Sequence, residues 1–247
     1  MAAPFATPGP RRSPGGRSGG GWRAFLGLTV PALCWEFLRR NPDYRSDYAN
    51  TMAGAGPLDR RWGLAAPADP ELCAEAGRVV WRADAAPALV VRAEQRSFGE
   101  ARESVLSGRE PIVGEDGRHL RLPSGLQVQL RGEASSSGPL VVMLSFDADF
   151  SLRVRAVEAL RRAELTDTPP RSRLSAAQRE RLARMLCALD GAFERRSYRQ
   201  IAADLFGEVE EGAAFKSSSV RDVTIRLVRS GRALMAGGYL KLLRGGF

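Results

Sequence analysis

Arginines and small hydroxyl side chains recur between positions 218 and 236, the part of the chain best equipped for chemistry. At 100° per residue, the apolar side chains of a helix here form one stripe, and the arginines lie on the roughly opposite side. Such a helix can pack by one face while its arginines pair with guanine bases or phosphates in a DNA major groove. The predicted stripe is Val220, Val223, Leu227 and Leu234. The predicted DNA contacts are Arg199, Lys216, Ser218, Ser219, Arg221, Thr224, Ile225, Arg226, Arg229 and Arg232.

The connection ahead of this helix leaves a second interpretation open. Residues 207–215 are longer than the about three or four residues usual in a helix-turn-helix. They also contain Glu208, Glu210 and Glu211, which DNA phosphates would repel. Either the motif is a variant or this loop points away from DNA. The alternative is an ordinary helical subdomain whose arginines face solvent.

Two further helices are predicted by their N-terminal caps. Residues 175–178 and 197–200 both read Ser-x-x-Gln, the capping box in which serine and glutamine each bind the other's backbone amide. Residues 219–222 have the looser acidic form of this motif at the start of the arginine-bearing helix. The first helix should end near Gly191, and the second should cover 198–206.

The formal net charge of +9 is concentrated at the two ends of the chain. Residues 1–23 carry +4, residues 24–170 carry −2, and residues 171–247 carry +7. A folded C-terminal module with this surplus is suited to a polyanion, most often nucleic acid. Only Lys216 and Lys241 are lysines, so a coding bias toward arginine also contributes to the basic character.

The sequence gives little support for metal binding or catalysis. His119 is the only histidine, so a zinc site or catalytic triad lacks partners, and a surface or half-buried strand position is favoured. Asp147 and Asp149 lie where a strand should end and a helix begin, and are more simply turn residues or helix-start anions. With no phosphate-binding loop either, we expect no enzymatic centre, metal or cofactor. The three cysteines, too scattered for a disulfide framework or a CxxC metal site, are expected to be core thiols: Cys34, Cys73 and Cys187.

The elements ahead of these helices change from helical to strand patterns and back. A Pro/Gly-rich start is expected to be disordered, and a short helix should begin at Thr29 and stop at Asn41 and Pro42. Strands are expected over 87–150, including a buried one over 139–146, and 152–165 has helical spacing with Arg153 largely outward. We therefore predict an α+β fold with a small helical N-terminal module, a small antiparallel sheet with helices, and a C-terminal helix-turn-helix-like helical module. The predicted division is a tail over 1–21, the helical module over 22–82, a sheet-and-helix body over 83–170 and the DNA-binding module over 171–247, with 83–247 as one domain the alternative.

Aromatic side chains gather in the N-terminal half. They could stack on nucleic-acid bases, but in a small module such residues more often supply the core, which is the favoured interpretation. They are Trp35, Phe37, Tyr44, Tyr48, Trp62 and Trp81.

Three stretches carry a family resemblance. S-Y-R-Q-I-A-A-D-L-F-G at 197–207 and L-V-R-S-G-R-A-L-M-A-G-G-Y-L-K-L-L at 227–243 resemble the variant helix-turn-helix domain of proteobacterial regulators of integrative conjugative elements. W-E-F-L-R-R-N-P-D-Y-R at 35–45 resembles the small "transcriptional regulator" module that precedes that domain in the activator form.

The resemblance implies a DNA-binding transcriptional activator of genes on a mobile element. Its implied partners are double-stranded DNA, RNA polymerase and a small antiactivator protein. The alternative, from another class, is a protein-interaction module that sequesters another regulator. No run of about 18 apolar residues and no secretory signal occurs, so we expect a cytoplasmic protein without membrane contact.

Overall fold

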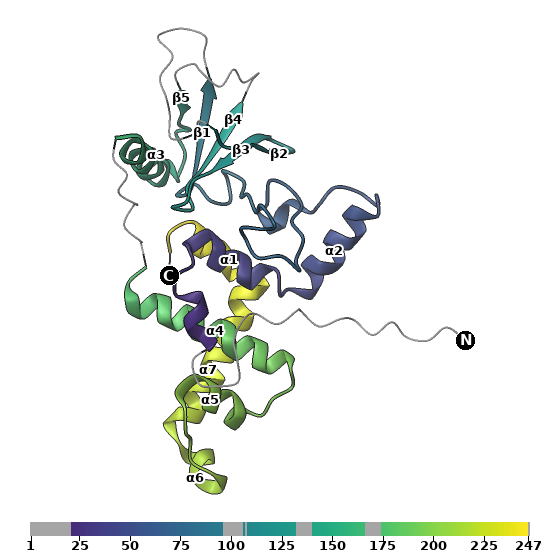
Figure 1. The fold of residues 1–247 in the computed structure, drawn as a ribbon, viewed down its shortest axis with the longest axis vertical. Coiled ribbons are helices and arrows are strands. Elements are labelled where there is room, and N and C mark those ends of the chain that lie inside the picture. The colour runs from purple at the N-terminus through teal and green to yellow at the C-terminus, as the bar shows by residue number, and fades with distance from the viewer. Residues whose placement is uncertain (1–20, 96–105, 107, 132–139, 166–173, 247) are drawn as a thin grey trace, which may run out of the picture. The chain divides into compact units, whose positions relative to one another are not determined.

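A computed structural model describes residues 21–95, 106, 108–131, 140–165 and 174–246 (Figure 1). The expected disordered tail therefore lies outside the described residues, apart from Gly21. The chain divides into two compact units. The helical unit comprises Met1–Gly27 and Arg179–Ala233, and the sheet unit comprises Leu28–Gln178 and Leu234–Phe247.

The helical unit is built from a short 3-10 helix near the N-terminus and the helices that follow residue 175. Both predicted capping boxes are present: in each, the glutamine amide accepts from the serine backbone and the serine hydroxyl accepts from the glutamine backbone. The predicted bounds of the second helix are confirmed. The elements are η1 (Gly21–Phe25), α4 (Ala176–Phe193), α5 (Tyr198–Phe206), α6 (Gly212–Ser217) and α7 (Ser219–Ala233).

The connection between α5 and α7 differs from the expected loop because it contains α6. This helix buries Phe215, which gives the segment an apolar anchor of its own. Ser218 then separates α6 from α7. Its hydroxyl accepts from the Arg221 amide at 3.3 Å, so Ser218, and not Ser219, caps the arginine-bearing helix.

The sheet unit combines helices at its two sequence ends with a five-stranded sheet. Its helical elements are α1 (Val30–Leu38), α2 (Pro42–Met52), η2 (Arg60–Trp62), α3 (Phe150–Leu165), η3 (Leu234–Gly238) and α8 (Tyr239–Leu243). The strands are β1 (Val90–Gln95), β2 (Ile112–Gly114), β3 (Gly117–Arg121), β4 (Gln127–Arg131) and β5 (Leu140–Met143).

The sheet has the order β2-β3-β4-β1-β5 and is mixed. β1 pairs with β4 in parallel, whereas the other three pairings are antiparallel, so the expected all-antiparallel sheet is corrected at this pair. The β2–β3 hairpin, which intervenes in sequence, joins the far side of β4 and leaves β4 free to run alongside β1. α3 lies beside the sheet (Figure 1), and its Ala156 and Leu160 pack on apolar side chains of the strands. The fold is α+β with a C-terminal helical module, as predicted.

The aromatic side chains of the N-terminal half form a core, which confirms the favoured interpretation. Trp35, Tyr44 and Trp81 are fully buried, and Tyr44 makes edge-on ring contacts with Trp35 and Trp62. The first helix ends at Leu38, before the expected stop at Asn41, and Asn41 instead caps α2 by accepting from two backbone amides.

Within the sheet unit, segments that are distant in sequence pack together. Residues 58–82 pack with the sheet: Gln127 of β4 accepts from the Trp81 amide, and the Glu115 amide donates to Ala65. α8 packs on α1, and the buried Tyr239 hydroxyl donates to the Trp62 carbonyl at 2.9 Å. These pairings join residues distant in sequence, which local patterns do not reveal.

Several side chains lie differently from expectation. Phe146, taken for part of a buried strand, is 92% exposed and stacks on Phe150. Arg153, expected to face outward, is buried and pairs with Asp147. His119 is fully buried, with its Nε2 2.8 Å from Asp116, and Cys73 is exposed rather than a core thiol.

Candidate nucleic-acid interface

The packed side of α7 determines which side chains remain outside. Thr224, Leu227, Val228 and Gly231 are buried, the spacing of one helical stripe. At Gly231 an added Cβ would lie 3.0 Å from the Met185 carbonyl oxygen, so the glycine lets α7 approach the backbone of α4 closely. The buried stripe is therefore rotated from the predicted one, whose first two valines are half-buried and whose last leucine lies beyond α7.

A similar close approach joins α4 and α5. A Cβ at Gly191 would lie 2.8 Å from Ile201 Cγ1, closer than real side chains pack. Ile201 itself is 2% exposed. The expected helix end at Gly191 is thus a packing position inside α4, which continues to Phe193. The two glycine contacts fix α5 and α7 against the same helix.

The outer side of α7 carries the predicted arginines. Arg221, Ile225, Arg229 and Arg232 follow one another at spacings of four, four and three residues and therefore share one side of the helix. At 1.5 Å per residue this row is roughly 16 Å long. Arg229 and Arg232 are exposed, whereas Arg221 and Ile225 are half-buried. Arg226 is exposed on an adjoining strip.

Two more predicted residues lie where α6 ends and α7 begins. Ser219 is exposed, and Lys216 at the end of α6 is exposed as well. Ser218 is half-buried, and its hydroxyl donates to the Phe215 carbonyl at 2.9 Å while accepting from the Arg221 amide. Its hydrogen-bonding groups are thus engaged in holding α6 against the start of α7.

Thr224 does not belong to this surface. Its side chain is fully buried, and its hydroxyl donates to the Val220 carbonyl at 2.8 Å. The prediction of a DNA contact at Thr224 is therefore wrong: a hydroxyl in a helix satisfies its hydrogen bond on the preceding turn, which allows it to sit among apolar neighbours.

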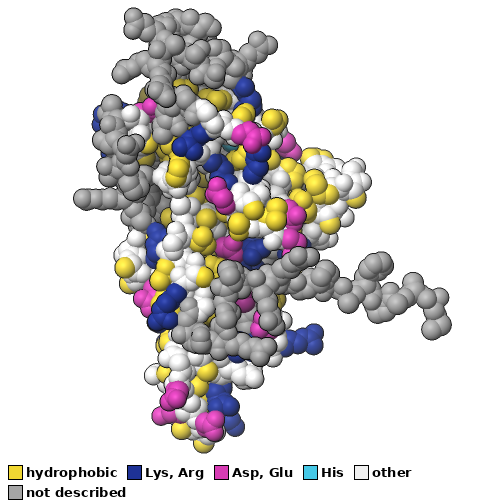
Figure 2. All heavy atoms as spheres, viewed as in Figure 1, with side chains coloured by type: hydrophobic (Ala, Val, Ile, Leu, Met, Phe, Trp, Pro, Cys, Tyr) yellow, Lys and Arg dark blue, Asp and Glu magenta, His cyan; other side chains and the backbone are white. Residues whose placement is uncertain are grey.

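Acidic side chains reduce the positive field of the surface. Arg199 on α5 pairs with Glu211 at 2.6 Å, and Arg221 lies 3.6 Å from Asp222. Figure 2 shows acidic and basic side chains next to one another at the end of the helical unit that α6 forms in Figure 1. Residues 179–233 carry 11 basic and 8 acidic residues, a net charge of +3. The arrangement of the arginines on α7 therefore matters more than their total.

The sequence did not predict a cation-π contact that joins η1, α4 and α5. The Arg184 guanidinium carbon lies 4.9 Å from the ring centre of Trp22 in η1 and 5.0 Å from that of Phe206 in α5. Arg184 also pairs with Glu180 at 2.6 Å. Trp22 is only 6% exposed. The N-terminal segment thus packs into the same unit as α7. Trp22 is the first large apolar residue after the Gly-rich start, and it was the feature of the sequence that could have predicted this packing.

Comparison with known families bears on these same residues. Residues 143–244 match the family model described as a T6SS transcription factor DNA-binding domain, and residues 16–67 match a proteobacterial transcriptional regulator-like domain. The two matches support a DNA-binding transcription regulator. No curated protein and no solved structure matches the chain.

The matched DNA-binding region of this regulator includes every predicted contact residue from Arg199 to Arg232. Within the described ranges, no three His, Cys, Asp or Glu side chains gather as metal ligands would. In the same part of the regulator, no helix is long and apolar enough to cross a membrane.

Proposed function

We propose that this regulator binds double-stranded DNA sequence-specifically through α7 and activates transcription. The observation that carries the proposal is the division of α7 into a buried stripe and an outer row of Arg221, Ile225, Arg229 and Arg232. A recognition helix must be held rigidly by one face so that the other can meet base edges and phosphates. In this proposal α5 and α7 act as a variant helix-turn-helix, with α6 in the connection.

Roles within the row differ by position. Arg221 lies in the first turn of α7, where a recognition helix approaches base edges, so it contributes to sequence choice. Arg229 and Arg232 lie toward the other end and are exposed, so they contact phosphates. Ile225 between them offers an apolar contact to a thymine methyl group.

Activation and the target genes rest on the resemblance and on the matched N-terminal domain. The conjugative-element regulators suggest promoters of a mobile element, whereas the matched DNA-binding family is described by a T6SS transcription factor. RNA polymerase and a small antiactivator are the proposed protein partners, and the proposal includes no catalytic step.

A second candidate function is sequestration of another regulator by the same surface. The observation that favours it is the mixed charge of the helical unit, where Glu211 neutralises Arg199 and two further glutamates lie in the connection before α6. A protein partner tolerates such alternation of charge better than a row of phosphates does.

Selection of DNA fragments by the purified full chain, followed by sequencing, separates the two functions. Sequence-specific binding predicts an enriched motif that also raises transcription when placed upstream of a reporter gene, whether it derives from a mobile element or from secretion genes. Sequestration predicts no enriched motif. An enriched motif that lowers transcription would leave the DNA-binding proposal standing and overturn activation.

A further inference from the structure

The positive charge at the N-terminal end of the chain is not used by the function proposed for α7. Residues 1–23 carry four arginines and no acidic residue. The first three lie outside the described residues, and the fourth is exposed in η1. They are Arg11, Arg12, Arg17 and Arg23. A basic segment that adjoins a DNA-binding domain is suited to a second contact with the same polyanion.

η1 ties this basic segment to the helical unit. The buried Trp22 ring lies 4.9 Å from the Arg184 guanidinium carbon, and the Arg179 guanidinium donates to the Leu26 carbonyl at 3.1 Å. Both arginines belong to α4, on which α7 also packs. The chain from Leu28 to Gln178 belongs to the sheet unit. The arginines that precede η1 are therefore attached to the unit that carries α7.

The distance along the chain from this anchor limits where the arginines can bind. A chain spans at most about 3.6 Å per residue. Arg17 therefore lies within about 18 Å of Trp22, and Arg11 within about 40 Å. One turn of B-DNA is about 34 Å long, and each major groove adjoins a minor groove. The arginines can thus reach the minor groove next to the major groove that α7 occupies.

The composition of the segment favours the minor groove. Residues 8–21 contain only proline, glycine, serine and arginine, of which proline and glycine are the poorest helix formers. A major groove is wide enough for a helix, whereas the minor groove is only about 6 Å wide and suits a slender chain. Where A·T pairs narrow the minor groove further, its negative potential rises and attracts arginine side chains.

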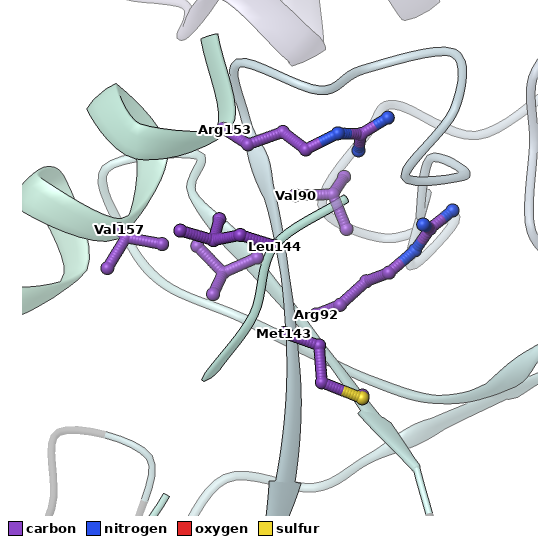
Figure 3. A pocket seen from close by; sticks show the side chains of 7 residues that line it. Val90, Arg92, Met143, Leu144, Arg153 and Val157 are labelled. Atoms are coloured by element: carbon purple, nitrogen blue, oxygen red, sulfur yellow. The ribbon is translucent and has the colours of Figure 1, made fainter. Parts of the chain in front are cut away.

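The two arginines of β1 and α3 offer no such contact. Arg153 is buried and pairs with Asp147, and together with Arg92 it lines a hollow of the sheet unit (Figure 3). This hollow has room for about one water molecule, so neither a base nor a phosphate fits there.

We propose that residues 8–21 form a basic arm whose Arg11, Arg12 and Arg17 bind the minor groove beside the major groove occupied by α7. The inference rests on the DNA-binding function proposed above and adds a second contact to it. The arm gives the regulator a preference for A·T pairs next to the motif bound by α7. Neither matched family description states such a contact.

The affinity of the full chain for its selected motif, with three different flanking sequences, tests the arm. The flanks contain A·T, G·C or inosine·C pairs. Inosine lacks the minor-groove amino group of guanine, so inosine·C combines the minor groove of A·T with the major-groove edge of G·C. Fluorescence anisotropy should show similar affinities for A·T and inosine·C flanks and about tenfold weaker binding to G·C flanks.

Arg11→Gln/Arg12→Gln/Arg17→Gln should abolish this preference. It should also reduce the slope of log affinity against log salt concentration by about three, because about one counterion is released per arginine contact. The charge-matched control replaces three exposed arginines of the sheet unit, Arg60→Gln/Arg155→Gln/Arg161→Gln, and should bind all three flanks as the wild type does.

The arm is overturned if the wild type binds the three flanks equally, or if the arm variant keeps the preference. An equal loss of affinity on all flanks would also overturn it, because the arginines would then contact phosphates alone. Tighter binding by the arm variant would overturn it as well, since the arginines would then pair with the exposed Glu208 and Glu210. In each case a selected motif leaves the function of α7 standing, whereas a chain that selects no motif overturns both.

Discussion

Arg229 and Arg232 differ from Arg221 in being exposed on the later turns of α7. If both contact phosphates, the double substitution Arg229→Gln/Arg232→Gln should weaken binding to every DNA sequence. It should also reduce the slope of log affinity against log salt concentration by about two, because about one counterion is released per phosphate contact. Fluorescence anisotropy over a range of salt concentrations measures both quantities.

Arg60 provides the control for this experiment because it is exposed and lies on η2 in the other unit. Arg60→Gln should leave both affinity and slope unchanged. An unchanged slope in the double variant would remove Arg229 and Arg232 from the DNA contacts. A change of preferred sequence with the slope unchanged would assign them to bases instead.

Asp222 lies in the first turn of α7, 3.6 Å from Arg221. Asp222→Asn should strengthen binding to all DNA sequences by about threefold, because it removes a negative charge next to the outer row of α7. It should also lower stability slightly, because an acidic side chain at a helix N-terminus is favourable. Glu194→Gln, exposed after α4, is the charge-matched control. Equal effects of both variants on DNA affinity would mean that only net charge matters.

At the scale of the elements, the contact between α4 and α5 depends on Gly191. Gly191→Ala should destabilise the helical unit by about 1–3 kcal/mol, because its Cβ would meet Ile201 Cγ1 at 2.8 Å and force the helices apart. Gly27→Ala is the control, since nothing lies within 4 Å of a Cβ there. Thermal unfolding measures both. A Gly191→Ala variant as stable as the wild type would show that α5 can shift without cost.

The sequence predicted those elements whose signals are local. The capping box at Ser197 and Gln200 and the glycine at 207 define α5 at both ends, so its bounds were correct. α6 was missed because only Phe215 anchors it and because its six residues carry no capping side chain. Thr224 was misplaced for a related reason: periodicity treats threonine as polar, whereas its hydroxyl is satisfied inside the helix.

At the scale of the whole molecule, the N-terminal segment belongs to the helical unit. Trp22→Ala should destabilise that unit by about 3 kcal/mol, because it removes a buried ring and the surface on which Arg184 stacks. Hydrogen exchange should therefore increase in α4, α5 and α7 but not in β1 and β4. Phe193→Ala, a 45% exposed aromatic on α4, should have a much smaller effect. Increased exchange in the sheet alone would contradict this assignment of the segment.

Contacts between segments far apart in the chain could not be predicted from the sequence. The parallel pairing of β1 with β4, and the packing of α8 on α1, join segments far apart in the chain. The same holds for Arg153, whose position in the helical pattern indicated an exposed side chain although it is buried. Periodicity assigns each residue to a face but does not show what covers that face.

The affinity of the full chain for its selected DNA sequence, measured with two matched charge-reversal variants, tests the role of α7 most directly. Arg221→Glu/Arg229→Glu reverses two charges in the outer row, and Arg60→Glu/Arg155→Glu reverses two exposed arginines of the sheet unit. We predict that the α7 variant binds about 100-fold or more weakly while remaining folded, because each arginine contact contributes about 1–3 kcal/mol, and that the sheet-unit variant loses far less. Equal losses, or an α7 variant that binds as tightly as the wild type, would contradict DNA binding through α7.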